Sequence, residues 1–107
     1  MGEREFHKGD LVRHFKREMV DPKSTEYLYR IVGTAVHSEN REKYMVYQAL
    51  YGDEGLYIRP YDMFMSEVDH AKYPEIRQQW RFDWVTEKDL EILWKMEKGN
   101  AEVTKAQ

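Results

Sequence analysis

Residues 47–64 read YQALYGDEGLYIRPYDMF and are the part of the chain that is most informative about the fold. Strand-forming residues flank a Gly-rich turn at 52–55, a pattern that predicts a β-hairpin. Pro60 follows the hairpin directly and suits the first position of a single 3₁₀ turn. Five residues of the stretch are aromatic, and Gln48 and Arg59 are its only long polar side chains outside the turn. The stretch is therefore typical of a small β-barrel with a polar, aromatic-lined surface.

The preceding part of the chain has the same strand character. Gly33 interrupts a long β-rich segment, and a glycine inside a strand commonly marks a bulge or a bend. Residues 16–26 are polar and contain Asp21-Pro22, which indicates a loop. Five short strands with a one-turn element before the last predict an SH3-like five-stranded barrel over 9–68; an OB-like barrel and a small sandwich are the alternatives. The expected strands span 10–16, 27–37, 43–51, 56–59 and 64–68.

The C-terminal third of the chain has a different character. Residues 69–85 are expected to connect the barrel to a helix, with 80–85 as a possible additional edge strand. A helix is expected over 86–98. The Gly-Asn pair that opens residues 99–107 is a helix-stop signal, so this tail should fray.

The predicted helix begins with a capping box. Thr86 would accept a hydrogen bond from the backbone N–H of Asp89, and the Asp89 carboxylate would accept one from the backbone of Thr86. Leu90, Leu93 and Trp94 then fall on one apolar stripe. The stripe predicts a strap packed on the barrel, and a dimerisation helix is the alternative.

Length and composition indicate one globular domain. The 107 residues suit a single hydrophobic core, and the charged share of 35% indicates a heavily charged exterior. The chain has no cysteine, which excludes a disulfide framework, a thiolate metal site and a cysteine nucleophile. No apolar run approaches the ~20 residues needed to span a bilayer, and the charged first residues do not resemble a signal peptide. We therefore expect a cytoplasmic protein without a membrane span and without a cofactor.

The charge distribution argues against non-specific nucleic-acid binding. Residues 1–60 carry ten basic and ten acidic side chains, whereas residues 61–107 carry seven and ten, which gives a net charge of −3. Binding to duplex phosphates needs a basic field that these totals do not provide. The N-terminal region does hold a local basic cluster, which we interpret as solvated, protective side chains of an edge strand. Its members are Arg4, Lys8, Arg13, Lys16 and Arg17.

Several longer motifs resemble one family of short bacterial proteins. They are RHFK at 13–16, YRIV at 29–32, AVHSE at 35–39, VYQALYG at 46–52, GLYIRP at 55–60 and MF at 63–64. Through these motifs, residues 9–68 resemble the domain-of-unknown-function family numbered sixteen fifty-three. The resemblance implies a small β domain of uncharacterised activity and carries over no catalytic residue.

Aromatic and long polar side chains supply the candidate binding residues. Seven of the eight tyrosines lie between positions 27 and 61, and some must reach the surface because a small barrel has room inside for only one face of each strand. Exposed rings interleaved with polar groups are typical of a recognition surface; half-buried tyrosines with solvated hydroxyl groups are the alternative. The Gln48 amide can donate and accept, and the Arg59 guanidinium suits a carboxylate or a phosphate unless it bridges to a nearby acid. The predicted ligand-binding residues are Tyr29, His37, Tyr47, Gln48, Tyr57 and Arg59.

The sequence favours binding over catalysis. The four histidines are too widely spaced for a metal-ligand motif, so no metal site is expected. The leading hypothesis is a non-enzymatic module that binds a small polar ligand, a nucleotide-like group or an extended peptide. One alternative is a protein–protein interaction or dimerisation scaffold that uses the C-terminal helix, and we expect a monomer or a weak homodimer. The other is a small enzyme or enzyme accessory domain that uses His37, Gln48 and Arg59.

Overall fold

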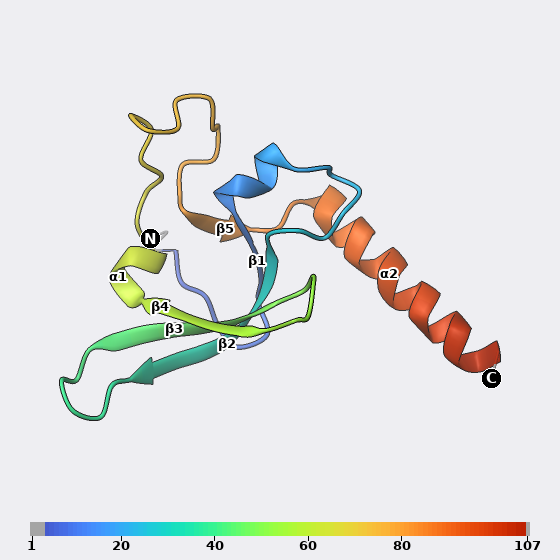
Figure 1. Cartoon of the computed structure of the whole chain (residues 1–107), viewed down its shortest axis with the longest axis horizontal. Helices are drawn as coiled ribbons and strands as arrows, with labels where there is room; N and C mark the ends of the chain where they lie inside the picture. The colour runs from blue at the N-terminus through green and yellow to red at the C-terminus, as the bar shows by residue number, and fades with distance from the viewer. Residues whose placement is uncertain (1–3, 107) are drawn as a thin grey trace.

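The computed structural model describes residues 4–106, and within the C-terminal helix it describes side chains as far as Met96. Five antiparallel strands form one sheet in the order β4-β3-β2-β1-β5 (Figure 1). The fold is therefore mainly β, as the strand patterns predict. The strands are β1 (Leu11–His14), β2 (Leu28–Val36), β3 (Lys43–Ala49), β4 (Leu56–Pro60) and β5 (Phe82–Trp84). The helical elements are the 3₁₀ helix η1 (Phe15–Met19) and the α-helices α1 (Tyr61–Phe64) and α2 (Glu87–Ala106).

The sheet is open at its two edge strands, β4 and β5. Within the described part of the chain these strands pair with β3 and β1 but not with each other. Strand β5 lies beside β1, with Phe82 opposite His14. It is the edge strand expected within 80–85, and it takes the place of 64–68 as the fifth strand. The predicted closed, SH3-like barrel is therefore not confirmed.

The predicted strand at 64–68 is wrong. The turn before it, α1, is α-helical rather than 3₁₀. The N–H groups of Met65 and Ser66 donate to carbonyl groups of α1, so they are not available for a strand ladder. The segment instead contributes an isolated bridge between Glu67 and Trp80.

Strand β2 bends at Gly33, where a bulge is predicted. The pairing register with β3 shifts between Ile31 and Gly33. Gly33 has a φ of +151°, a backbone conformation that side chains with a Cβ rarely adopt. Before the bend, β2 pairs with both β1 and β3 and buries Tyr29 and Ile31; beyond it, β2 pairs with β3 alone and is mostly exposed.

The larger of two hydrophobic clusters among the described residues packs against the sheet and brings β5 close to β3. Phe64 of α1 and Phe82 of β5 stack with their ring centroids 3.9 Å apart, and the ring of Tyr47 in β3 lies 5.3 Å from that of Phe82. Full burial of a phenylalanine side chain stabilises a fold by about 1.5–3 kcal/mol. The core therefore holds β5 close to β3, although these two strands are not hydrogen-bonded to each other. Its buried members are Phe6, Val12, Tyr29, Ile31, Met45, Tyr47, Ala49, Phe64 and Phe82.

Part of the N-terminal basic cluster is structural, so the solvated interpretation is wrong for Arg4, Arg13 and Arg17. Arg4 donates to the carbonyl groups of Met65 and Phe82, and Arg13 to the Asp89 carboxylate. Arg17 lies in η1, which occupies the start of the loop expected at 16–26, and it is only 4% exposed. Its guanidinium donates to Asp89 Oδ1 at 3.0 Å and to three backbone carbonyl groups. These carbonyl groups belong to Pro22, Ser24 and Glu26.

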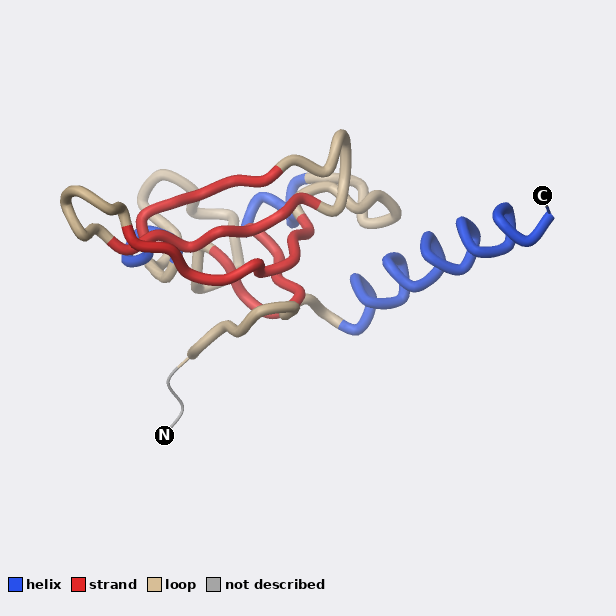
Figure 2. Tube along the Cα trace, turned by 90° about the horizontal axis from the view of Figure 1, so that it is seen from below, coloured by secondary structure: helices blue, strands red, loops and turns tan. Residues whose placement is uncertain are grey.

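The N-terminus of α2 has the predicted capping box. The Thr86 N–H donates to Asp89 Oδ2 at 2.9 Å, and the Asp89 N–H donates to Thr86 Oγ1 at 3.1 Å. Because the same carboxylate also binds Arg13 and Arg17, the first turn of α2 is fixed to β1 and η1. The rest of the helix extends away from the sheet, as two perpendicular views show (Figures 1 and 2).

The predicted packing of α2 on the barrel is wrong. Leu90 is 45% exposed and Trp94 is 57% exposed, since the anchored first turn directs the helix outward. The helix also continues to Ala106, past the predicted stop at 99–107, because a glycine within a helix costs only about 1 kcal/mol. No helix among residues 4–106 combines the length and the apolar character needed to cross a membrane.

Candidate functional site

Four of the predicted binding residues meet on the inner side of the sheet. The Tyr57 ring lies 5.9 Å from the Tyr47 ring and 6.4 Å from the Tyr29 ring, measured between centroids. Arg59 follows two positions after Tyr57, and its Nε donates to the Tyr47 hydroxyl at 3.2 Å. Tyr29 and Tyr47 are buried, whereas Tyr57 is 45% exposed. Arg59 and Tyr57 are therefore the members of this group that a ligand can reach.

The other two predicted residues lie elsewhere. Gln48 alternates with the buried Tyr47 and Ala49 along β3, so it belongs to the opposite face of the sheet, and its amide donates to the Glu54 carbonyl at 3.1 Å. His37 is exposed beyond the end of β2, where its Nδ1 accepts from the N–H groups of the turn that follows. The structure does not bring His37, Gln48 and Arg59 together in one site.

The side chain of Arg59 lines a pocket of about 250 Å³, which we call the basic pocket. The pocket forms where β1, η1 and the end of β4 meet the segment between α1 and β5. The rings of His14, Phe15 and Tyr73 provide aromatic surface. Its charged lining residues are Lys16, Arg59, Asp69, Lys72 and Arg81.

Positive charge exceeds negative charge in the basic pocket. Four lining residues are cationic, and within the described residues none of the four lies within ion-pair distance of a carboxylate. Asp69 is the single acid of the lining, and its Oδ1 accepts from the backbone N–H groups of Ala71 and Lys72. Burial, and then the nearby charge of Arg59, lowers the pKa of Arg81. A bound anion would relieve this mutual repulsion.

His14 contributes a neutral ring to the pocket. Burial, followed by the positive charges of Arg59, Arg81 and Lys16, lowers the pKa of His14 to about 3. Its ring packs 4.9 Å from that of Phe82, and Nδ1 accepts from the Lys16 N–H, which leaves Nε2 to carry the proton. A neutral imidazole with this tautomer offers a hydrogen-bond donor. The part of the chain that the structure describes contains no group of acids and histidines suited to a metal ion.

Sequence reasoning found Arg59 but missed most of the basic pocket. Lys16 was assigned to the solvated cluster, and Lys72 and Arg81 lie in a segment expected to be a connection. With Arg59, these cations come from three separate segments of the chain, so no spacing rule unites them. The sequence carries no local signal for these cations, because their excess over acids arises only where the fold brings the segments together.

The fold and the pocket together define a small, mainly β protein with an aromatic-walled cationic pocket. The family model described as "Protein of unknown function (DUF1653)" matches residues 10–84, and the chain belongs to this family. The match runs beyond the resemblance over 9–68 and includes the whole segment that carries Lys72 and Arg81, whereas α2 lies outside it. Comparisons with curated proteins and with solved structures found no match.

Proposed function

We propose that this protein is a non-enzymatic recognition module whose basic pocket binds one anionic group of a small ligand or peptide. The observation that carries the proposal is the concentration of Lys16, Arg59, Lys72 and Arg81 around a single pocket with one acid. The chain as a whole is slightly acidic. The pocket therefore favours one phosphate or carboxylate group rather than an extended polyanion.

The neighbouring side chains support selective binding in this pocket. The Tyr47 hydroxyl holds the Arg59 guanidinium at one side of the pocket, which reduces the entropy that the arginine loses on binding. Tyr73 lines the pocket, and the exposed ring of Tyr57 lies two positions from Arg59 on the same strand. Both rings offer flat contact surface for the remainder of a ligand.

We also propose that the fold is of the SH3-like type. The order β4-β3-β2-β1-β5, the helical turn after β4 and the bend of β2 at Gly33 support this class, since a bent second strand can belong to two halves of a small barrel. An experimental structure in which β2 runs straight through Gly33 would contradict it.

Titration of the ¹⁵N-labelled full chain tests the anion proposal. We expect phenyl phosphate or benzoate to shift the backbone amide signals of Lys16, Lys72 and Arg81 saturably, and the probe that binds identifies the anionic group. Arg59→Gln should weaken binding at least fivefold. Lys23→Gln, which removes the same charge from an exposed turn outside the pocket, should leave binding unchanged. Equal weakening by both variants, or no saturable shift with either probe, would refute the proposal.

A second candidate function is self-association through α2. The specific observation is that Leu90, Trp94 and Met96 are each about half exposed on a helix that extends away from the sheet (Figure 2). Sedimentation equilibrium of the full chain should then detect a dimer that Leu90→Glu dissociates. A monomer at all accessible concentrations would exclude this function.

A further inference from the structure

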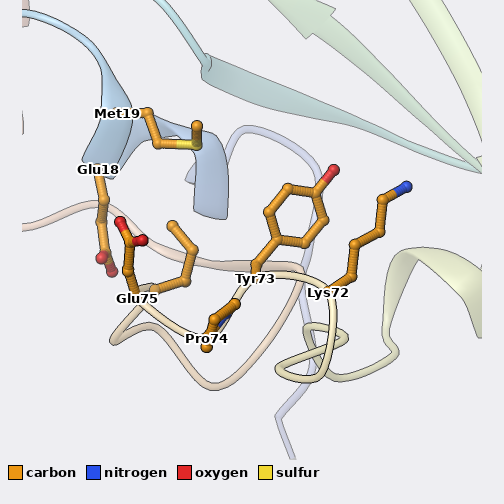
Figure 3. A pocket seen from close by; sticks show the side chains of 7 residues that line it. Glu18, Met19, Lys72, Tyr73, Pro74 and Glu75 are labelled. Atoms are coloured by element: carbon orange, nitrogen blue, oxygen red, sulfur yellow. The ribbon is translucent and has the colours of Figure 1, made fainter.

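A second pocket lies beside the basic pocket and shares two residues with it. It has a volume of about 310 Å³ and is lined by residues of η1 and of the 72–76 segment. Lys72 and Tyr73 line both pockets. Figure 3 shows the Lys72 ammonium and the Tyr73 hydroxyl extending away from the carboxylates of Glu18 and Glu75. Tyr73 therefore forms a wall between a region of positive charge and a region of negative charge.

The second pocket combines apolar walls with two carboxylates and one cation, Lys72, whose ammonium extends away from the carboxylates. Ile76 is buried at 7% exposure, and the Tyr73 ring is fixed by an edge contact with Phe15, with centroids 4.9 Å apart. Met19 is 63% exposed, so its flexible side chain is available for contact. These groups provide apolar contact for the methylene stem of a long side chain.

The carboxylate of Glu18 is held in place before any ligand arrives. Its Oε1 accepts from the Arg77 N–H at 2.9 Å and its Oε2 from the Gln78 N–H at 2.8 Å. Each carboxylate oxygen has a second lone-pair site, so Glu18 can still accept from a cation. Glu75 is exposed and adds a second negative charge to the same pocket.

From this combination we infer that the second pocket takes the ammonium or guanidinium group of a lysine-like or arginine-like side chain. Tyr73, Met19 and Ile76 contact the stem, and Glu18 and Glu75 receive the charged head. Because the two pockets share a wall, their joint ligand is a peptide segment with a basic side chain next to an anionic group. This joint assignment rests on the proposed function, whereas the cation pocket stands by itself.

The cation pocket is tested with two probes that share the same four-carbon stem and differ by the terminal ammonium group. N-acetyl-lysine methylamide should shift the amide signals of residues 18–19 and 72–76 of the ¹⁵N-labelled full chain. The neutral N-acetyl-norleucine methylamide should bind at least fivefold more weakly. Glu75→Gln should weaken the lysine probe at least fivefold, and it avoids the backbone contacts that Glu18→Gln would disturb. Glu39→Gln, at an exposed turn, is the matched control.

The outcomes of these titrations distinguish the cation pocket from the proposal that the basic pocket binds an anion. Equal binding of the lysine and norleucine probes, or no effect of Glu75→Gln, overturns the cation pocket even if phenyl phosphate binds. Failure of phenyl phosphate and benzoate with retained lysine binding overturns the anion proposal alone. The joint assignment requires that acetyl-Lys-phosphoserine amide, or acetyl-Lys-Asp amide, bind at least tenfold more tightly than acetyl-Lys-Ser amide. Equal affinities of all three peptides overturn it.

Discussion

Replacing Asp89 by alanine should remove the most highly connected ionic contact among the described residues. Its carboxylate accepts from Arg13 Nη1 at 3.1 Å, Arg17 Nε at 3.0 Å and the Thr86 N–H at 2.9 Å. The side chains of Arg17 and Asp89 are 2% and 6% exposed. Asp89→Ala would therefore leave the Arg17 charge buried without a carboxylate.

The magnitude follows from two separate losses. Breaking a buried ion pair by removal of one partner costs about 3–5 kcal/mol. The loss of the hydrogen bond from the Thr86 N–H to the Asp89 carboxylate costs about 1 kcal/mol, while Thr86 Oγ1 still caps the helix through the N–H of residue 89. Arg17 keeps its three carbonyl acceptors, which places the ionic loss at the lower end. We expect the free energy of unfolding to fall by about 4 kcal/mol in total. Asp89→Asn should cost less, because the asparagine amide oxygen can still accept a hydrogen bond from the Thr86 N–H or from Arg17.

Urea unfolding monitored by tryptophan fluorescence measures the difference. The matched control is Glu91→Ala, also near the start of α2, where Glu91 pairs with Lys95 at 3.5 Å and the two side chains are 63% and 64% exposed. An exposed pair of this kind contributes about 0.2–1 kcal/mol. If Asp89→Ala cost no more than Glu91→Ala, the buried network around Arg17 would not be a stabilising feature.

Two further predictions concern the core and the pocket. Phe82→Ala should lower the free energy of unfolding by about 3–5 kcal/mol in a urea titration, because the ring is fully buried and stacked on Phe64; a cost below about 1 kcal/mol would contradict the packing. The folded-state pKa of His14, about 3, lies below its ordinary value of 6.5, so its contribution is complete above pH 6.5 and is lost as the pH falls towards 3. His14→Gln should therefore reduce the slope of unfolding free energy against pH in this window by up to about 1.4 kcal/mol per unit, and an unchanged slope would show that the ring is not held neutral.

The local features of the fold could be predicted from the sequence because each depends on near neighbours. The bulge at Gly33 and the capping box of Thr86 and Asp89 are both present where their patterns indicate them. The fifth strand is misplaced because residues 64–68 complete a five-strand order along the sequence, whereas tertiary pairing with β1 selects residues 82–84. The packing of α2 was misjudged because an apolar stripe indicates a buried face but does not identify the surface that covers it.

The sequence predicts only the part of the candidate site that lies within the hairpin of β3 and β4. Alternation along β3 and β4 correctly groups Tyr47, Tyr57 and Arg59 on one face, and the same alternation removes Gln48 from it. The remaining cations of the basic pocket come from η1 and from the segment between α1 and β5. Their convergence depends on how that segment folds back over β1, which is a long-range property that periodicity does not record.

The buried ionic network of Arg13, Arg17 and Asp89 also connects the two pockets to the stability of the fold. Arg17 stands between Lys16, which lines the basic pocket, and Glu18, which lines the second pocket. Since the Arg17 guanidinium is fixed by Asp89, the first turn of α2 determines where η1 lies and hence where both neighbouring side chains point. This turn lies outside the part of the chain that matches the family model, residues 10–84. A chain that ends at residue 84 would lack the Asp89 anchor, so we expect η1, and with it the side chains of Lys16 and Glu18, to be less firmly positioned in such a chain.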